Sequence, residues 1–320
     1  MVQAGIKSIA VASVEDDLRS ELARSDTAIG SIGPVLRNLL ANDDHSLFSD
    51  EIVARVRGML GDLARQLLAV EAEEAGAEDP LAAAERHAPE VSASLIADTA
   101  LLGHVHALAL EWQLTERLQA RNGLDAALSP LLQAHIASRD AGAAETAMAT
   151  LAAQVRFLQH ARRMELPLGE LPGDLFHAAL QVMRAHAGTS EPDAAERAVT
   201  RLRGDYDEGK SRLALIAKLV TGLGTTATMA LAVDHAGAAI FLSALALASG
   251  QDRDLAVLST NDRQLARLAL AMRAAGLKRE QAEAQFVFLH PEVSLPEGFD
   301  ALRANAAAAL LASASPFGEA

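Results

Sequence analysis

The chain has 320 residues, of which 50% are hydrophobic and only 3% aromatic, and its formal net charge is −14. The apolar content is mostly Ala, Leu and Val, which favours helices over sheets because aromatic and most β-branched types are scarce. An acidic surface repels phosphate backbones and anionic lipid, and the absence of Cys excludes disulfides, thiol catalysis and cysteine-based metal sites.

The acidity is concentrated at the start of the chain, where the first 90 residues hold 8 basic and 17 acidic side chains. The opening segment contains one Lys and a short apolar run that acidic residues follow at once, so we expect no secretory signal. A short helix is predicted over 31–40, with Pro34 in its first turn.

The clearest helix is predicted over 50–70, with Ser49 as its cap. Apolar residues there recur at the three/four spacing of one buried stripe: Ile52, Val53, Val56, Met59, Leu60, Leu63, Leu67 and Leu68. Four charged residues are expected largely off the stripe: Arg55, Arg57, Asp62 and Arg65. The polar run 71–80 that follows is interpreted as a solvated helix end and a linker, and the first domain boundary is placed near it.

Residues 90–120 are predicted to form one long helix, which stops at 121–125 with Gly123 near the C′ position. Further helices are expected over 125–138, 142–165, 173–187, 191–203, 205–220, 225–233, 236–249, 261–275, 278–288 and 298–313. The short connections between them indicate neighbouring, roughly antiparallel helices.

These elements predict an all-α fold of stacked antiparallel helices, either an irregular bundle or a degenerate, HEAT-like α-solenoid. No strict repeat occurs at a period of 30–47 residues. We expect three parts: an N-terminal acidic helical segment over 1–75, a central helical domain over 89–222 and a C-terminal helical domain over 223–320.

The best candidate for a membrane segment lies between Lys218 and Gln251, where Asp234 and His235 interrupt two uncharged runs. Neither run supplies roughly 20 predominantly apolar residues. Buried core helices are the better interpretation, and we expect no membrane association.

Three short patterns resemble functional sites but lack the spacing that the chemistry requires. On a helix His104 and His106 are about 200° apart, which prevents them from binding one metal. Asp234 and His235 have no nucleophile elbow nearby, and Asp234 is expected to cap the following helix. Gly222 to Thr226 lacks the lysine of a phosphate loop. We therefore predict no catalytic, cofactor-binding or metal-binding residues and no cofactor.

Residues 265–286 have the shape of a helix-turn-helix, with Gly276 at the turn. A recognition helix would use residues near its N-terminus, and the candidates are Lys278, Arg279, Gln281 and Ala282. The segment 251–290 holds six basic and five acidic residues, so it is hardly basic. Structural helical hairpins share this shape, and packing is favoured over DNA recognition.

The segment 237–291 also resembles the C-terminal part of an uncharacterised alphaproteobacterial family, domain of unknown function 2336. The matching positions are Gly237, Phe241, Ala244-Leu245-Ala246, Ser249-Gly250, Val257-Leu258, Arg273 to Leu277 and Phe286. This resemblance implies a helical protein that acts through protein contacts, and it implies no catalytic residues.

The leading hypothesis is a non-enzymatic helical scaffold or regulatory adaptor in the cytoplasm that binds another protein of unknown identity. A homodimer is a further possibility, and we do not expect nucleic acid as a partner. One alternative is a transcriptional regulator that uses the C-terminal helix-turn-helix. A second is an enzyme with a pocket between helices, around His104, Trp112 and His160.

Overall fold

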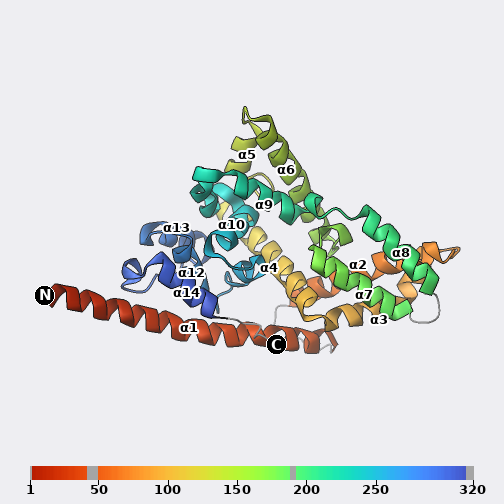
Figure 1. Cartoon of the computed structure of the whole chain (residues 1–320), viewed down its shortest axis with the longest axis horizontal. Helices are drawn as coiled ribbons and strands as arrows, with labels where there is room; N and C mark the ends of the chain where they lie inside the picture. The colour runs from red at the N-terminus through yellow and green to blue at the C-terminus, as the bar shows by residue number, and fades with distance from the viewer. Residues whose placement is uncertain (1, 42–49, 188–191, 315–320) are drawn as a thin grey trace. The chain divides into compact units, whose positions relative to one another are not determined.

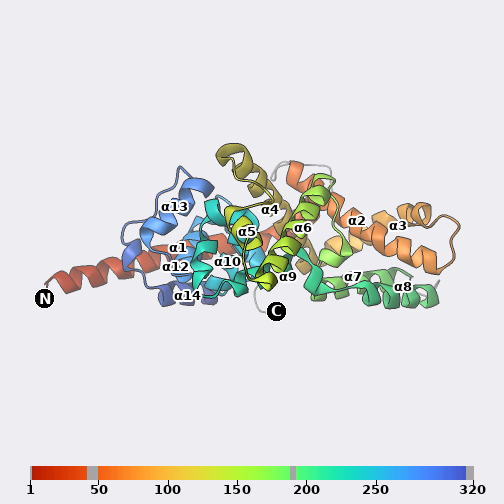
Figure 2. The same ribbon diagram turned by 90° about the horizontal axis from the view of Figure 1, so that it is seen from above.

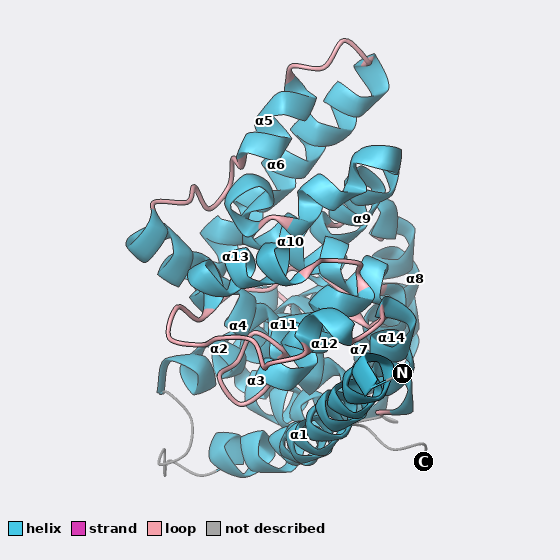
Figure 3. Cartoon of the chain, turned by 90° about the vertical axis from the view of Figure 1, so that its left-hand side faces the viewer, coloured by secondary structure: helices cyan, strands magenta, loops and turns pink. Residues whose placement is uncertain are grey.

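The computed structural model describes residues 2–41, 50–187 and 192–314 (Figure 1). Within these ranges the chain forms fourteen α-helices and four 3-10 helices, with no strand (Figure 3). The predicted all-α fold class is confirmed. The predicted cap at Ser49 lies outside the described residues.

The elements follow one another in this order: α1 Val2–Ala41, α2 Asp50–Glu74, α3 Pro80–Ala97, α4 Thr99–Asn122, α5 Pro130–Ile136, α6 Ala141–Arg162, η1 Leu168–Glu170, α7 Gly173–Ala187, α8 Pro192–Asp205, η2 Glu208–Lys210, α9 Arg212–Gly222, η3 Gly224–Leu231, α10 Val233–Ser249, α11 Arg253–Leu258, α12 Leu265–Ala274, α13 Arg279–Leu289, η4 Phe299–Ala301 and α14 Ala304–Ser313.

The chain divides into two compact units. The central unit comprises 33–109 and 149–215, and the C-terminal unit comprises 1–32, 110–148 and 216–320. The expected boundary between residues 75 and 89 falls inside the central unit, where α2 and α3 pack as a helical hairpin. The division into parts at 1–75, 89–222 and 223–320 stays a prediction about which segments fold independently.

The central unit is organised around α2, which contacts α3, α7 and α8 (Figures 1 and 2). All eight predicted stripe residues of α2 are buried. Their burial removes apolar surface from water, which is the main driving force for packing the helices that surround α2. The helix therefore forms as its apolar spacing predicts.

Arg55 is an exception to the predicted surface of α2, because it is buried among the stripe residues. Its guanidinium donates hydrogen bonds to the carbonyl of Ala161 and, at 3.1 Å, to Glu51. A long arginine stem packs like an apolar side chain when its charged end finds acceptors. The prediction that Arg55 lies off the stripe was wrong for this reason.

The predicted single helix over 90–120 is also wrong, since α3 ends at Ala97 and α4 begins at Thr99 with a bend of 96°. Asp98 stands at the break, and its side chain accepts a hydrogen bond of 2.9 Å from the N–H of Leu101. A short acidic side chain that caps a helix start competes with continuation of the helix before it. The apolar spacing continues across the break, which explains the error.

The C-terminal unit is organised around α10, which contacts η3, α5, α11, α12 and α13. Nearly every residue of α10 from Ala236 to Ala246 is buried. Gly237 interrupts its helical backbone with φ +72°, a conformation that glycine adopts without a steric penalty. The helix is thus the buried centre of its unit.

Several predicted helix boundaries need correction. The helix expected over 31–40 is the end of the longer α1, and the one expected from residue 205 begins at Arg212 after a 3-10 turn. The segment 225–233 is largely the 3-10 helix η3, and 261–275 is helical only from Leu265. Short connections with local hydrogen bonds shift such boundaries, and apolar spacing does not record them.

None of the described helices is by itself long and apolar enough to cross a bilayer. Two bent pairs, α3 with α4 and η3 with α10, together meet that length and composition, the second pair with a bend of 107°.

Candidate functional site

Helices α12 and α13 contact each other across the turn that the sequence singles out. Gly276 adopts φ +92° at this turn, and the N–H of Leu277 donates to the carbonyl of Met272 at 3.0 Å. Helices commonly end with a residue in the left-handed conformation, and the N–H of the next residue then bonds back to a carbonyl of the last turn. The predicted helix–turn–helix shape is therefore present in this part of the C-terminal unit.

The four candidate recognition residues do not share one surface. Lys278 and Gln281 are exposed, and the backbone N–H of Lys278 donates to the side chain of Gln281 at 3.0 Å. Ala282 has an exposed fraction of 0%, so it cannot contact a base edge in this conformation. The first turn of α13 offers only two of the four candidates to a ligand.

Arg279 is held by its own surroundings. Its guanidinium donates to Glu283 at 2.7 Å and to the carbonyls of Leu295 and Pro296 at 3.1 and 3.2 Å. A guanidinium whose donors are engaged in this way has fewer left for a phosphate or a base. The arginine ties the start of α13 to the segment that follows the helix.

The side of α13 away from its unit is apolar toward its end. Phe286 and Leu289 are buried, whereas Gln281, Ala284 and Val287 are exposed at successive turns of the same helix. We call these three residues the outer face of α13. The side chain of Val287 has an exposed fraction of 60%. The spacing of apolar residues in this segment does not by itself indicate that Ala284 and Val287 stay exposed.

A buried histidine lies directly after α13. Nδ1 of His290 lies 3.0 Å from Oδ1 of Asp262, and its ring is 6.1 Å from that of Phe286. Burial lowers the pKa of His290, which the charge of Asp262 opposes and that of Arg117 reinforces. Burial likewise lowers the pKa of Arg117, again against the effect of Asp262. This group of charges couples the end of α13 to α4.

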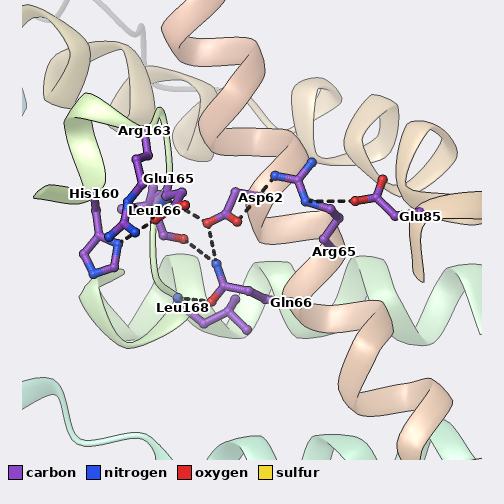
Figure 4. Close-up of polar contacts among 9 residues, drawn as sticks. All are labelled: Asp62, Arg65, Gln66, Glu85, His160, Arg163, Glu165, Leu166 and Leu168. Carbon is purple, nitrogen blue, oxygen red and sulfur yellow. Dashed lines mark hydrogen bonds and ion pairs between the residues drawn. The ribbon is translucent and has the colours of Figure 1, made fainter. Parts of the chain in front are cut away.

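In the central unit a polar network fixes the loop after α6 against α2 (Figure 4). Asp62 accepts from the N–H of Leu166 at 3.0 Å, and Gln66 bonds to the backbone of Leu166 and Leu168 at 2.9 and 3.0 Å. His160 lies in the last turn of α6, and its Nδ1 is 3.0 Å from Oε2 of Glu165 in the loop. These bonds satisfy backbone groups that a loop would otherwise leave unpaired.

Glycine at position 58 permits the close approach of this loop. A Cβ atom there would lie 2.6 Å from Cβ of Met164, which itself has φ +56°. Contacts that short do not occur between real side chains. The loop geometry therefore depends on both the polar bonds and the missing side chain.

Behind the loop lies a cavity of about 20 Å³, lined among others by Phe157, His160, Glu165, Glu170 and Arg212. The Arg212 guanidinium stacks 3.7 Å from the centre of the Phe157 ring. Such a volume admits about one water molecule. The cavity is thus too small for a metabolite as it stands.

Of the residues named for an enzyme pocket, only His160 lines this cavity. His104 and Trp112 are buried in α4, as is His106. Asp234 and His235 lie in the first turn of α10, whose N-cap is Ala232, so the prediction that Asp234 caps this helix was wrong. The segment 222–226 spans the end of α9 and the start of η3, so it is a turn between two helices.

A second group of polar residues gathers on the surface of the central unit. His87 and Glu90 lie one turn apart on α3, and His186 lies in the last turn of α7. One potential ligand atom from each lies within 4.8 Å of those from the other two. The prediction of no metal-binding residues did not consider this group, because its three residues come together only when α7 packs against α3.

No family model, curated protein or solved structure matches this chain.

Proposed function

We propose that this protein is a non-enzymatic helical adaptor that binds another protein through the outer face of α13, formed by Gln281, Ala284 and Val287. The observation that carries the proposal is the exposed fraction of Val287, 60%, on a helix whose opposite side buries Phe286 and Leu289. A helix with apolar residues on both sides gains free energy when a second helix covers the outer one.

The partner is an amphipathic helix with a basic edge. Glu280 is exposed in the first turn of α13, and Glu292 and Glu297 are exposed in the segment after it. Arg279 adds no free positive charge here, since it pairs with Glu283. Exposed acidic residues on and just after an apolar helix attract a helix that combines apolar anchors with Lys or Arg.

The proposal also covers the cellular compartment of the protein and the family to which it belongs. The lack of Cys and the resemblance of 237–291 to an alphaproteobacterial family both suit a bacterial cytoplasmic protein, and the helical-repeat character expected of that family belongs to the same proposal. DNA recognition and catalysis are the competing functions, and the variants described next distinguish DNA recognition from partner binding.

The test places a photo-activated cross-linking residue at Val287 and, as a control, at Ala93, an exposed position on α3. We expect Val287 to capture a partner that Ala93 does not. A synthetic peptide spanning the partner's amphipathic helix should then bind the purified chain, and Val287→Asp should weaken that binding at least about tenfold while Ala93→Asp does not.

Three results contradict the proposal. The first is peptide binding that Val287→Asp leaves unchanged. The second is self-association that depends on Val287, which identifies a second copy of the chain as the occupant. The third is salt-sensitive DNA binding at low ionic strength that Lys278→Glu combined with Arg279→Glu abolishes, which favours the regulator.

A further inference from the structure

We propose that His87, Glu90 and His186 form a binding site for a divalent transition-metal ion of the zinc type. Two imidazoles and one carboxylate are a ligand set that zinc accepts, with water completing the coordination. Calcium and magnesium prefer oxygen ligands, so the two histidines select against them.

The positions of the three residues follow from packing of the helices. Ala84, Ala88 and Val91 are buried on one side of α3, which places His87 and Glu90 beside that buried stripe, one turn apart. On α7, Met183 and Ala187 are buried, and His186 lies between them in sequence. Since α3 contacts α7 within the central unit, the histidine of one helix meets the pair on the other.

The distances are close to those that a single ion requires. Nδ1 of His186 lies 3.9 Å from Oε2 of Glu90, and the ring centres of His87 and His186 are 5.6 Å apart. Ligand atoms around a tetrahedral zinc ion, with bonds of about 2.0–2.1 Å, are about 3.3 Å from one another. The ligand atoms of the group lie within 4.8 Å of one another, so they must move closer to bind one ion. The side chains of His87 and Glu90 are exposed, Glu90 with an exposed fraction of 71%, and rotation about their side-chain bonds allows this movement.

The surroundings also favour a cation. His186 stands in the last turn of α7, where the helix dipole places partial negative charge. Glu90 brings a full negative charge that no arginine or lysine ion pair within the described residues neutralises. An ion held there would bridge α3 and α7 and close a chain segment of about one hundred residues, which stabilises the folded state.

The test uses the full chain without a histidine tag, titrated with zinc chloride in a calorimeter and in thermal unfolding. We expect one zinc ion per chain. At a free zinc concentration about a hundredfold above Kd, Tm should rise by several degrees. Cobalt(II) should bind at the same site and give the intense visible absorption of a four-coordinate ion. Magnesium chloride should have no effect.

The variants decide which residues bind the ion. His87→Ala and His186→Ala should each weaken zinc binding by at least about tenfold, and Glu90→Gln should do so while preserving the shape of the side chain. His177→Ala is the matched control, because His177 is exposed on the same α7 but does not belong to the group.

The proposal is overturned if the chain binds no zinc up to millimolar concentration, or if His87→Ala and His186→Ala bind as the natural sequence does. Equal losses in His177→Ala would also contradict it. Since His87 and Glu90 are exposed, their variants retain the fold, and circular dichroism verifies this before titration. None of these outcomes depends on the outer face of α13, so partner binding is tested separately.

Discussion

Helices α2 and α10 are the centres of their units, yet they are buried in different ways. α2 buries one stripe of residues and exposes others, such as Ala54 and Arg57. Apolar residues therefore recur at helical spacing in its sequence, and this spacing indicates which side of the helix faces the core. α10 is buried on almost every side, so its sequence is apolar nearly throughout and does not indicate which side of the helix faces which neighbour. The apolar spacing of α2 therefore indicates which of its sides the neighbouring helices cover, whereas that of α10 does not, and polar groups add specificity around α10.

The polar groups around α10 have defined partners. Arg253 donates to Ser243 of α10 at 2.8 Å and to the fully buried Glu111 of α4 at 2.9 Å. Gln285 of α13 accepts a hydrogen bond of 2.8 Å from the N–H of Val233, at the start of α10. Such bonds are costly to break and are satisfied in only one arrangement, which orients neighbours that apolar contacts leave free.

The largest expected effect comes from breaking the buried pair in the C-terminal unit. Glu111→Ala should lower the free energy of unfolding by about 3–5 kcal/mol, because it leaves Arg253 charged and without its carboxylate. Urea unfolding followed by circular dichroism measures the loss. Replacing both residues by Met should restore much of it, since two apolar side chains need no charge partner.

The control for this pair lies on the surface of the central unit. Arg201 and Glu73 are 2.6 Å apart, with side chains nearly half exposed, and Glu73→Ala should cost far less than Glu111→Ala. If the two carboxylate variants proved equally destabilising, buried polar pairing would not distinguish the surroundings of α10 from those of α2.

A second prediction compares the two helices through matched apolar truncations. Leu60 of α2 and Leu245 of α10 both have an exposed fraction of 0%. Leu60→Ala and Leu245→Ala should each lower the free energy of unfolding by about 2–5 kcal/mol, from lost burial and the cavity left behind. Val287→Ala, on an exposed side chain of α13, should change it much less. Urea denaturation of the three variants measures these differences, and a small loss at Leu245 would mean that the surroundings of α10 collapse into the cavity.

The same contrast explains how much of this molecule could be predicted from its sequence. The stripe of α2 is visible because most of its exposed residues are polar, and the eight apolar positions predicted from the three/four spacing are all buried. Two further buried residues, Arg55 and Ala64, were not predicted. The break at Asp98 was missed because apolar residues continue at helical spacing on both sides of it. Spacing reports which side of a helix is buried, but it does not report where one helix ends and the next turns away.

The candidate sites were harder to predict for another reason. His87 and Glu90 are neighbours in sequence, but the third member of their group, His186, is brought to them only by packing of α7 on α3. A His-x-x-Glu pair on a helix was the one signal available, and it is weak without its partner. The predicted bounds of α13, 278–288, are correct to within one residue, but the burial of Ala282 and the hydrogen bonds of Arg279 depend on residues outside the helix.

The smallest expected effect is a pH dependence in the C-terminal unit. Burial lowers the pKa of His290 below its ordinary value of 6.5, with Asp262 opposing and Arg117 reinforcing the shift. Below pH 6.5 His290 therefore binds a proton more readily in the unfolded chain than in the folded chain. Stability contributed by neutral His290 is full above this pH and is lost as the pH falls from 6.5 toward the lowered pKa.

His290→Gln removes this titration while keeping a polar side chain. Urea unfolding midpoints at pH 7.5, 6.5 and 5.5 should fall less steeply with acidification in this variant than in the natural sequence. His177→Gln, which alters an exposed histidine of α7, should retain the natural slope. If all three proteins share one slope, burial of His290 does not couple folding of the C-terminal unit to pH, and the ion pair with Asp262 must offset the cost of removing the imidazole from water.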